Sequence, residues 1–449
     1  MLLKNPILAS PTKDCFNDTQ MLLIYISKLT PRIIYVFKHI CTHILGVEIK
    51  FTSKIEEFIA HEGLKFSYGK KRLGNEIFFQ NVDLLLEQGL SDIKIKVQTW
   101  EETKCFFSVS ENSDLPFDIF AASFYLLSRY EEYLPHVKDD YGRFQASESL
   151  AYKSGFLEQP VVDIWAYKLK NLLEARFGHL PVPKRKFETI TIISVSHVFN
   201  FKNKGFLRSL SGTVLDLLNL KFSRISDRFK VLLKIKKDPY DVFDDLIQII
   251  KKHKTKMVFM FQLSDYNSYD KNINYNRQNY RSIIKYAADY SQVGLRLGYF
   301  AVQEASVIKR EKKRFENIIH APLQNVINTK YNLMLPLNYG FLNELEIPND
   351  FSMGFPESIG FRAGTGNSFL FYDINMEVTT PLTINPYVFH TQLCHTGVAV
   401  DIEEKINSMK AELKKVDGTF RGVFKNRDFS EYANSSYFYS LLKQIHEIK

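Results

Sequence analysis

The sequence predicts an α/β protein, with an N-terminal α/β domain followed by a second domain of parallel α/β architecture that is closed or nearly so. Buried-type strands alternate with amphipathic helices along the 449 residues, and repeated β-then-α units are typical of parallel sheets. The chain is too long for one ordinary core, which indicates two or three domains. Hydrophobic residues make up 45% and charged residues 24% of the sequence, the balance of a globular protein.

The first elements follow in order from the N-terminal end. The apolar part of the first ten residues is interrupted by Lys4, Asn5 and Pro6, so we expect no secretory signal. Residues 1–20 are expected to form a disordered extension upstream of the first strand. Met21 opens "MLLIYI", a predicted strand, so both Met1 and Met21 are candidate starts. Pro31 suits the first turn of a helix, and "GVEIKFT" then returns as a strand.

Two short strands and two helices complete the expected N-terminal domain. The strands are predicted at "EIFFQ" and "DIKIKVQTW". "SDLPFDIFAASFYLLSRYEEYL" predicts a helix capped by Ser113 or Asp114, and "PVVDIWAYKLKNLLEARFG" predicts a second helix. Residues 178–187 carry two prolines and a basic run without periodicity. We therefore expect a boundary there, between a domain of residues 21–178 and a domain of residues 188–449.

The second half alternates between strands and helices. The expected order is strand 189–195, helix 241–252, strand "KMVFMFQL", a helix near 277–290, strand "QVGLRLGYF", helix 302–319 and helix 402–416. The segments "GFRAGTG", "LTINPYVF" and "GTFRGVF" are interpreted as later strand ends. In α/β enzymes the carboxyl ends of strands carry the chemistry, so the residues there are the first candidates for a site.

Charge and cysteine content set loose limits on partners and compartment. The formal net charge of +9 is small for this length; it permits an anionic glycan, a nucleic acid or a membrane surface as partner but demands none. We predict no nucleic-acid binding. The cysteines lie far apart without a CxxC pair, at Cys15, Cys41, Cys105 and Cys394, which favours a reduced, cytoplasmic protein. No apolar run approaches the length of a membrane span.

Three stretches make the sequence resemble a known family. They are "DIFAASFYLLSRYEEYL" followed by "DDYGRF", then "FNFKNKG", and "GFRAGTGNSFLFYD" at residues 360–373. From Met21 onward the chain looks like the Bacteroidetes-type polysaccharide deacetylases, which pair an N-terminal domain of unknown function with a NodB-like domain. The resemblance implies a NodB-type distorted barrel and a divalent metal, zinc, held by Asp and His side chains. Such a metal polarises an acetyl carbonyl and activates water, while a carboxylate acts as base.

The positions that match the family's metal and acid–base motifs carry other residue types. The resemblance implies an acidic pair where this chain has Ser194 and Ser196, and a hydroxyl is a poor metal ligand and a poor base near neutral pH. It implies histidines where this chain has Arg296, Thr329 and Lys425. A permanent cation such as Arg296 repels a metal ion. The resemblance therefore predicts a degenerate catalytic site, and we predict no cofactor.

Four residues are candidates for substrate binding. Arg362, in the surviving "FRAGTG" motif, and Asp373 can hold substrate, or they can maintain loop structure in a barrel no longer used for chemistry. Tyr266 and Tyr269 lie in the loop 264–276, which is rich in Tyr and Asn. Aromatic faces stack on sugar rings and amides bond hydroxyls, but this is also ordinary loop composition.

A replacement metal site is an alternative. His197 lies beside the lost acidic pair, and "FHTQLCH" adds His390, Cys394 and His395 at spacings that metal ligands use. No carboxylate or fourth ligand is fixed by the sequence. A lone His near a strand end is more often an ordinary polar residue, so a site built from His197, His390 and His395 is the less favoured interpretation.

The segment 202–237 is strongly basic, with ten Lys or Arg against two Asp. Leu210, Val214, Leu217 and Leu218 give it an apolar side. Such a segment can make a weak peripheral contact with an anionic membrane surface or bind an acidic polymer. The favoured interpretation is a solvated helical pair packed on the barrel, with Lys and Arg pointing outward.

These observations give one functional prediction and two alternatives. We predict a catalytically degenerate, polysaccharide-deacetylase-like protein of surface-polysaccharide metabolism, which binds carbohydrate or acts as an accessory factor. The first alternative is an active metal-dependent carbohydrate deacetylase or hydrolase with displaced ligands. The second is a membrane-surface or protein-interaction module that uses the basic segment 202–237.

Overall fold

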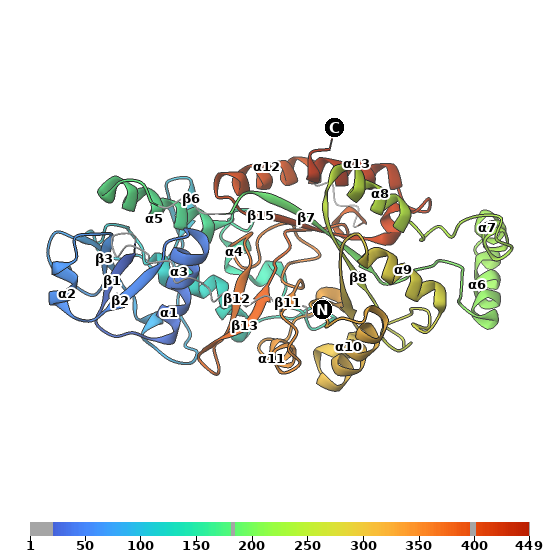
Figure 1. The fold of residues 1–449 in the computed structure, drawn as a ribbon, viewed down its shortest axis with the longest axis horizontal. Helices are drawn as coiled ribbons and strands as arrows, with labels where there is room; N and C mark the ends of the chain where they lie inside the picture. The colour runs from blue at the N-terminus through green and yellow to red at the C-terminus, as the bar shows by residue number, and fades with distance from the viewer. Residues whose placement is uncertain (1–20, 181–184, 396–400, 449) are drawn as a thin grey trace, which may run out of the picture.

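The computed structural model describes residues 21–180, 185–395 and 401–448 (Figure 1). The expected extension at residues 1–20 and part of the expected domain boundary lie outside the described residues. None of the described helices is long and apolar enough to cross a membrane.

The N-terminal part is built on a four-stranded parallel sheet with the order β2-β1-β3-β4. Its strands are β1 (Leu22–Ile26), β2 (Ile49–Thr52), β3 (Lys65–Gly69) and β4 (Ile77–Gln80). The helix expected after Pro31 forms as α1 (Pro31–Phe37), continues as a π-helix (Lys38–Ile44), and is followed after β2 by α2 (Ile55–Ala60). The Thr30 hydroxyl caps α1 by accepting a hydrogen bond from the Ile33 N–H, 3.2 Å away.

Helix α3 (Ile119–Leu127) is buried along its whole length. Its cap is Asp118, whose Oδ1 accepts hydrogen bonds from the N–H groups of Phe120 and Ala121, so the expected caps Ser113 and Asp114 are wrong. The chain is still extended at Phe117, which forms a bridge with Ser108, and this delays the start of the helix. Helix α5 (Val161–Phe177) follows after the short α4 (Leu150–Lys153). Only Gln98–Trp100 of "DIKIKVQTW" is a strand, β5, paired with β6 (Thr103–Cys105).

The second half is built on a nine-stranded sheet with the order β12-β13-β11-β10-β9-β8-β7-β15-β14. Its central strands are β7 (Glu188–Val195), β8 (Lys256–Phe261), β9 (Gln292–Leu297), β10 (Asn325–Asn328) and β15 (Thr419–Lys425). Its outer strands are β11 (Asn349–Asp350), β12 (Phe369–Asp373), β13 (Val378–Ile384) and β14 (Phe389–His390). Only β12 runs antiparallel to its neighbour. The mixed α/β class with parallel sheets is confirmed, whereas barrel closure is not, because the sheet order ends at β12 and β14.

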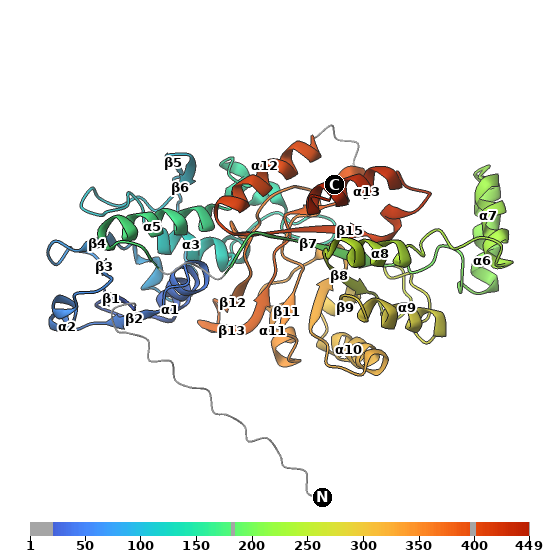
Figure 2. The same cartoon turned by 45° about the horizontal axis from the view of Figure 1, so that its top comes forward.

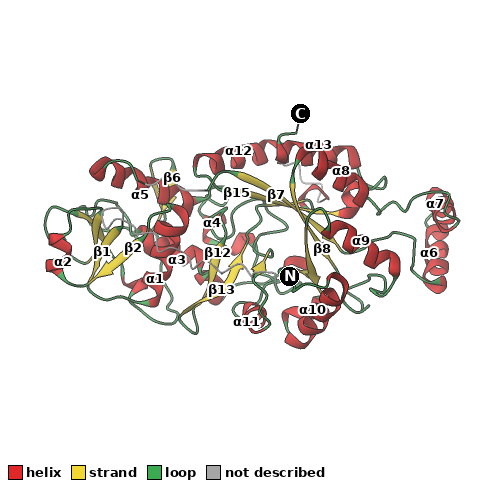
Figure 3. Ribbon diagram, viewed as in Figure 1, coloured by secondary structure: helices red, strands yellow, loops and turns green. Residues whose placement is uncertain are grey.

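Helices lie outside this sheet (Figure 3). They are α8 (Phe243–His253), α9 (Gln278–Ala288), α10 (Ala305–Ile319), α11 (Leu337–Glu344), α12 (Ile402–Lys415) and α13 (Ser435–His446). The four helices expected from the sequence in this half correspond to α8, α9, α10 and α12. "GFRAGTG" is not a strand end but a loop that precedes β12, so this interpretation is wrong. The other face of the sheet holds a smaller apolar cluster that includes Ile192, Met260 and Val423.

The basic segment folds into two helices, α6 (Phe206–Leu218) and α7 (Phe222–Leu232). They stand clear of the sheet and its covering helices at one end of the molecule (Figures 1 and 2). The expected helical pair is present, but its expected packing on the barrel is wrong, and its apolar side chains are exposed alongside Lys and Arg side chains such as Arg208, Lys221 and Lys230.

Candidate functional site

Arg296 lies at the centre of a polar cluster at the carboxyl ends of the strands. Side chains alternate between the faces of a strand, so Ser194 at the end of β7 and Arg296 on β9 turn to the face opposite the helices. The Arg296 guanidinium donates to Ser194 Oγ at 3.2 Å, to Gln262 Oε1 at 2.6 Å and to Thr329 Oγ1 at 2.7 Å. The structure thus brings together three of the positions singled out from the sequence.

The charge of Arg296 is buried without a carboxylate bonded to it. Its hydrogen-bond acceptors in the described structure are two hydroxyls and one amide oxygen. A carboxylate compensates this positive charge indirectly: Gln262 accepts from Arg296 and donates through its amide N–H to the buried Asp270. Burial lowers the pKa of Arg296 from its usual value. A guanidinium stays protonated even so, which leaves a fixed positive charge beneath the strand ends.

Lys425 adds a second cation beside Ser194. The two residues are register partners on the adjacent strands β15 and β7. Lys425 lines a cavity of about 450 Å³ together with Tyr240, Lys330, Gln392, His395, Arg427, Asp428, Ser430, Tyr432 and Ala433. Burial, followed by the nearby Arg427, lowers the pKa of Lys425 to about 8. The mouth of the site is therefore positively charged near neutral pH.

A strained turn places Lys330 in this cavity. Lys330 and Tyr331, directly after β10, have φ values of 58° and 57°. Left-handed backbone at non-glycine residues costs about 1 kcal/mol or more each and tends to cluster at functional sites. The turn directs Lys330 to the cavity and buries Tyr331 against His390, with 4.5 Å between the ring centroids.

The three histidines of the alternative metal site do not converge as ligands. His197 Nδ1 lies 3.0 Å from Ser196 Oγ, His390 Nδ1 accepts the Gln392 N–H at 2.7 Å, and His395 Nε2 lies 3.2 Å from Asp428 Oδ1. Burial lowers the pKa of His197 to about 4. In the described part of the chain, no group of three or more His, Cys, Asp or Glu side chains could hold a metal ion. The centre of the cluster is instead a guanidinium, so these residues do not fit the zinc that the resemblance implies.

Arg362 serves the contact between the two halves of the chain and is not among the residues that line the cavity around Lys425. Its guanidinium donates to both carboxylate oxygens of Glu132, at 2.9 and 2.7 Å, and to the Gly354 carbonyl at 3.1 Å. Asp373 accepts the N–H groups of Asn375 and Met376 in the turn between β12 and β13. A substrate at Arg362 would have to displace Glu132, so these contacts favour structural roles over substrate binding for Arg362 and Asp373.

Tyr266 and Tyr269 lie on an exposed surface next to the strand ends. Tyr269 stacks on Tyr299 with 3.9 Å between ring centroids and 10° between planes, and Tyr266 carries Arg208 over its ring at 3.7 Å. Strand β9 ends at Leu297, and Tyr299 follows after Gly298. This aromatic surface therefore borders the edge of the sheet where Arg296 lies. About half of the Tyr269 side chain remains exposed, which leaves one aromatic face for a ligand.

Four residues of the site were not predicted from the sequence: Gln262, Lys330, Arg427 and Asp428. Gln262 directly follows β8 and accepts from Arg296, and its polar side chain after "KMVFMF" was the available signal. Asp428 accepts from Thr391 and from the Lys425 N–H. Lys330 directly follows Thr329, which the sequence had already singled out. Treating the first residues after every predicted strand as site candidates would have found Gln262 and Lys330, because ligands bind at the carboxyl ends of parallel strands.

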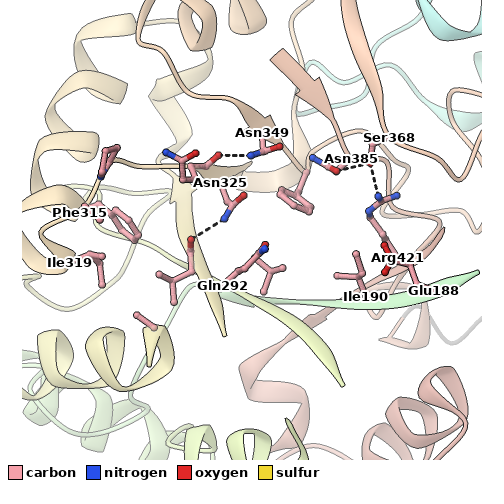
Figure 4. Close-up of a pocket in the computed structure, with 17 residues that line it drawn as sticks. Glu188, Ile190, Gln292, Phe315, Ile319, Asn325, Asn349, Ser368, Asn385 and Arg421 are labelled. Atoms are coloured by element: carbon pink, nitrogen blue, oxygen red, sulfur yellow. Dashed lines mark hydrogen bonds between the residues drawn. The ribbon is translucent and has the colours of Figure 1, made fainter. Parts of the chain in front are cut away.

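A second cavity lies at the opposite, amino-terminal ends of the strands (Figure 4). Its volume is about 630 Å³, and Glu188, Gln292, Asn325 and Arg421 are among the residues that line it. Arg421 is held by the Gly366 carbonyl and Ser368 Oγ. None of the candidate site residues lines this cavity.

Comparisons with known proteins find one family model and several solved structures that are similar to this chain. Residues 22–178 match the model of a family of unknown function, DUF7033. No curated protein matches.

Among solved structures, the chain is similar to polysaccharide deacetylases. One, assigned as a polysaccharide deacetylase of Mycobacterium smegmatis, shares 8% identity over 60% of this chain and 87% of that chain, with a TM-score of 0.37. A polysaccharide deacetylase of Bacillus cereus shares 10% identity over 59% of this chain and 88% of that chain, with a TM-score of 0.29. A mutant CE4-family pseudoenzyme with restored activity shares 10% identity over 54% of this chain and 67% of that chain, with a TM-score of 0.25. Because all three TM-scores are below 0.5, these likenesses do not assign an activity to this chain.

Proposed function

We propose that this protein is a polysaccharide-deacetylase-like component of surface-polysaccharide metabolism that binds a glycan at the strand ends and does not carry out metal-dependent hydrolysis. One observation carries this proposal: Arg296 occupies the centre of the site and is bonded to Ser194 and Thr329. The resemblance implies metal ligands at all three positions. A guanidinium there repels a divalent cation and attracts an anion.

The same charges select the class of glycan. Lys330, Lys425 and Arg427 line the cavity above Arg296. The one carboxylate among the lining residues, Asp428, is already engaged by Thr391 and by the Lys425 N–H. An acidic sugar would pair with these cations through charge-assisted hydrogen bonds. The exposed ring of Tyr269 would stack on a neighbouring sugar unit.

The binding test compares two β-1,4-linked trisaccharides that differ only at C6, where one carries a carboxylate and the other a hydroxymethyl group. We expect a β-1,4-linked mannuronate trisaccharide to bind at least about tenfold more tightly than mannotriose in isothermal titration, because a single buried charge pair is worth this much or more. Lys425→Gln should remove most of the preference, and Lys94→Gln, on an exposed loop, should not. Equal binding of the two sugars would refute an acidic ligand.

The hydrolysis test addresses the alternative of an active enzyme with displaced ligands. We expect no acetate release from an acetylated mannuronate trisaccharide when zinc is added to the purified protein. Zinc bound in a one-to-one ratio, together with acetate release that is lost in His197→Ala or His395→Ala, would support that alternative and refute the proposal. Cys41→Ala, which alters a buried cysteine in the N-terminal part, is the matched control.

A further inference from the structure

Helices α6 and α7 expose most of their apolar side chains and bury a polar pair, Asp216 and Arg228, between them. More than half of the surface of each of ten apolar residues in this hairpin is exposed: Phe206, Leu207, Leu210, Leu215, Leu217, Leu218, Leu220, Phe222, Phe229 and Leu233. A surface helix of a globular protein normally does the reverse. Soluble proteins rarely leave an apolar patch of this kind uncovered.

The apolar residues of α6 share one face. At about 100° per residue, Phe206, Leu210 and Leu217 lie within roughly 40° of one another, and Leu207 and Leu218 extend the face to about 120°. On α7, the same spacing places Phe222, Phe229 and Leu233 together. The hairpin therefore presents a continuous apolar surface that nothing in the described structure covers.

The contact between the two helices is polar. Asp216 of α6 and Arg228 of α7 are both buried and form an ion pair. Arg228 also donates to the Ser209 carbonyl. Gly212 makes room for it, because a Cβ there would lie 2.6 Å from Arg228 Nη1. This buried ion pair holds α6 and α7 against each other through their polar sides, with the apolar side chains on the outside of the pair.

The charge of the hairpin distinguishes among surfaces that could cover it. Ten Lys or Arg and two Asp lie in residues 202–237, giving a net charge of +8. Both acids are already paired, Asp216 with Arg228 and Asp227 with Lys236. Two copies of so basic a surface repel each other, whereas an anionic lipid surface attracts both the cations and the apolar side chains.

We propose that the α6–α7 hairpin docks on an anionic membrane surface, with its apolar face inserted among the headgroups. Docking would also place the candidate site near the lipid. Tyr432 lines the cavity that holds Lys425 and accepts Arg224 of α7 over its ring at 5.5 Å, and its hydroxyl donates to Asp227 at 2.7 Å. Helix α7 thus contacts one residue of the cavity wall, Tyr432. This inference stands independently of the ligand proposed for that cavity.

The test is flotation of the full chain with lipid vesicles. We expect at least about tenfold more binding to vesicles of equimolar phosphatidylcholine and phosphatidylglycerol than to phosphatidylcholine alone. Binding should weaken in about 1 M NaCl, where the Debye length falls to about 3 Å. The triple variant Leu207→Ser, Leu218→Ser and Phe222→Ser should lose at least about tenfold of the binding, because the apolar contact is removed.

A matched control separates this surface from exposed apolar residues in general. Ile59→Ser, Val137→Ser and Met376→Ser alter side chains that are similarly exposed elsewhere, at 67%, 63% and 70%, and should leave vesicle binding unchanged. Circular dichroism of each variant is the check that it is folded. No binding of the unaltered chain to the anionic vesicles, or equal loss in both triple variants, would overturn the proposal. A dimer that only the hairpin variant converts to monomer would also overturn it, because a second copy would then be the partner.

Discussion

Arg362 and Glu132 form a buried, two-point ion pair that joins the two halves of the chain. Both side chains are almost completely buried, and Arg129 donates to the same carboxylate at 2.7 Å. Burial alone would raise the pKa of Glu132, but Arg362 and Arg129 overcome it and hold this pKa at about 2. The two most distinctive stretches of the sequence, "SRYEEYL" and "GFRAGTG", are therefore the two sides of one contact.

The first prediction is that breaking this pair destabilises the protein. Glu132→Gln leaves two buried guanidinium groups without their shared carboxylate, so we expect a loss of about 3–5 kcal/mol in the free energy of unfolding, measured by urea denaturation. Glu148→Gln, which breaks a more exposed pair with Lys153, should cost less than about 1 kcal/mol. Similar losses in the two variants would show that the buried pair has no special role.

The second prediction concerns the buried Glu311 of α10. Burial raises the pKa of this carboxyl to about 8, and the Gly298 N–H only partly opposes the shift. The native state therefore keeps a proton that the unfolded chain releases above its ordinary value of 4.5. The contribution of Glu311 to the free energy of unfolding is therefore greatest at low pH, and it is lost as the pH rises towards 8.

Glu311→Gln should remove this loss, because the neutral amide can still accept the Gly298 N–H. We expect the variant to be more stable than the unaltered protein by about 2 kcal/mol at pH 9 and similar to it at pH 5, measured by urea denaturation. Glu304→Gln, at an exposed position of the same region, should show no such difference. A Glu311→Gln variant that is destabilised at both pH values would mean that Glu311 is charged and paired in the native state.

The third prediction is a pH dependence of acidic-glycan binding. An anion pairs with the protonated form of Lys425. Because the pKa of Lys425 is about 8, most molecules have lost this proton at pH 9. We expect the affinity for the mannuronate trisaccharide to fall about tenfold between pH 7 and pH 9. Lys425→Gln should bind weakly with a flat profile over this range. A flat profile in the unaltered protein would place the carboxylate away from Lys425.

The strand ends could be located from the sequence because their signals are local. Alternation along β7, β9 and β10 places Ser194, Arg296 and Thr329 on one edge of a parallel sheet, and short apolar runs mark those strands. The cap of α3 failed for a local reason as well, since Ser113, Asp114 and Asp118 are all good capping residues. Only the bridge at Phe117 decides among them.

The partners of Arg362 and the orientation of the hairpin could not be predicted in this way. Arg362 and Glu132 are 230 residues apart, and nothing in either motif identifies the other as its partner. For α6 and α7, the pattern establishes that an apolar face exists but not the direction in which it points. The exposure of that face depends on tertiary contacts, among them the buried pair of Asp216 with Arg228 that joins the two helices through their polar sides.

The last prediction tests whether Ser194, Arg296 and Thr329 form a former metal site. Arg296 bonds directly to the other two side chains, so Ser194→Asp, Arg296→His and Thr329→His together would direct one carboxylate and two imidazoles to the space that the guanidinium now fills. Ser196 is left unaltered, because its hydroxyl bonds to His197 instead. We expect this triple variant to bind zinc in isothermal titration with micromolar affinity or better, since these are common zinc ligands in a suitable number.

The matched control is the double variant Ser194→Asp and Ser196→Asp, which restores the acidic pair but keeps Arg296. It should not bind zinc, because the fixed cation remains at the centre of the site. A folded triple variant that fails to bind would mean that the three positions never held one ion. Zinc binding by the unaltered protein would instead mean that other groups supply the ligands, and the proposal of a glycan-binding site without metal chemistry would fall with it.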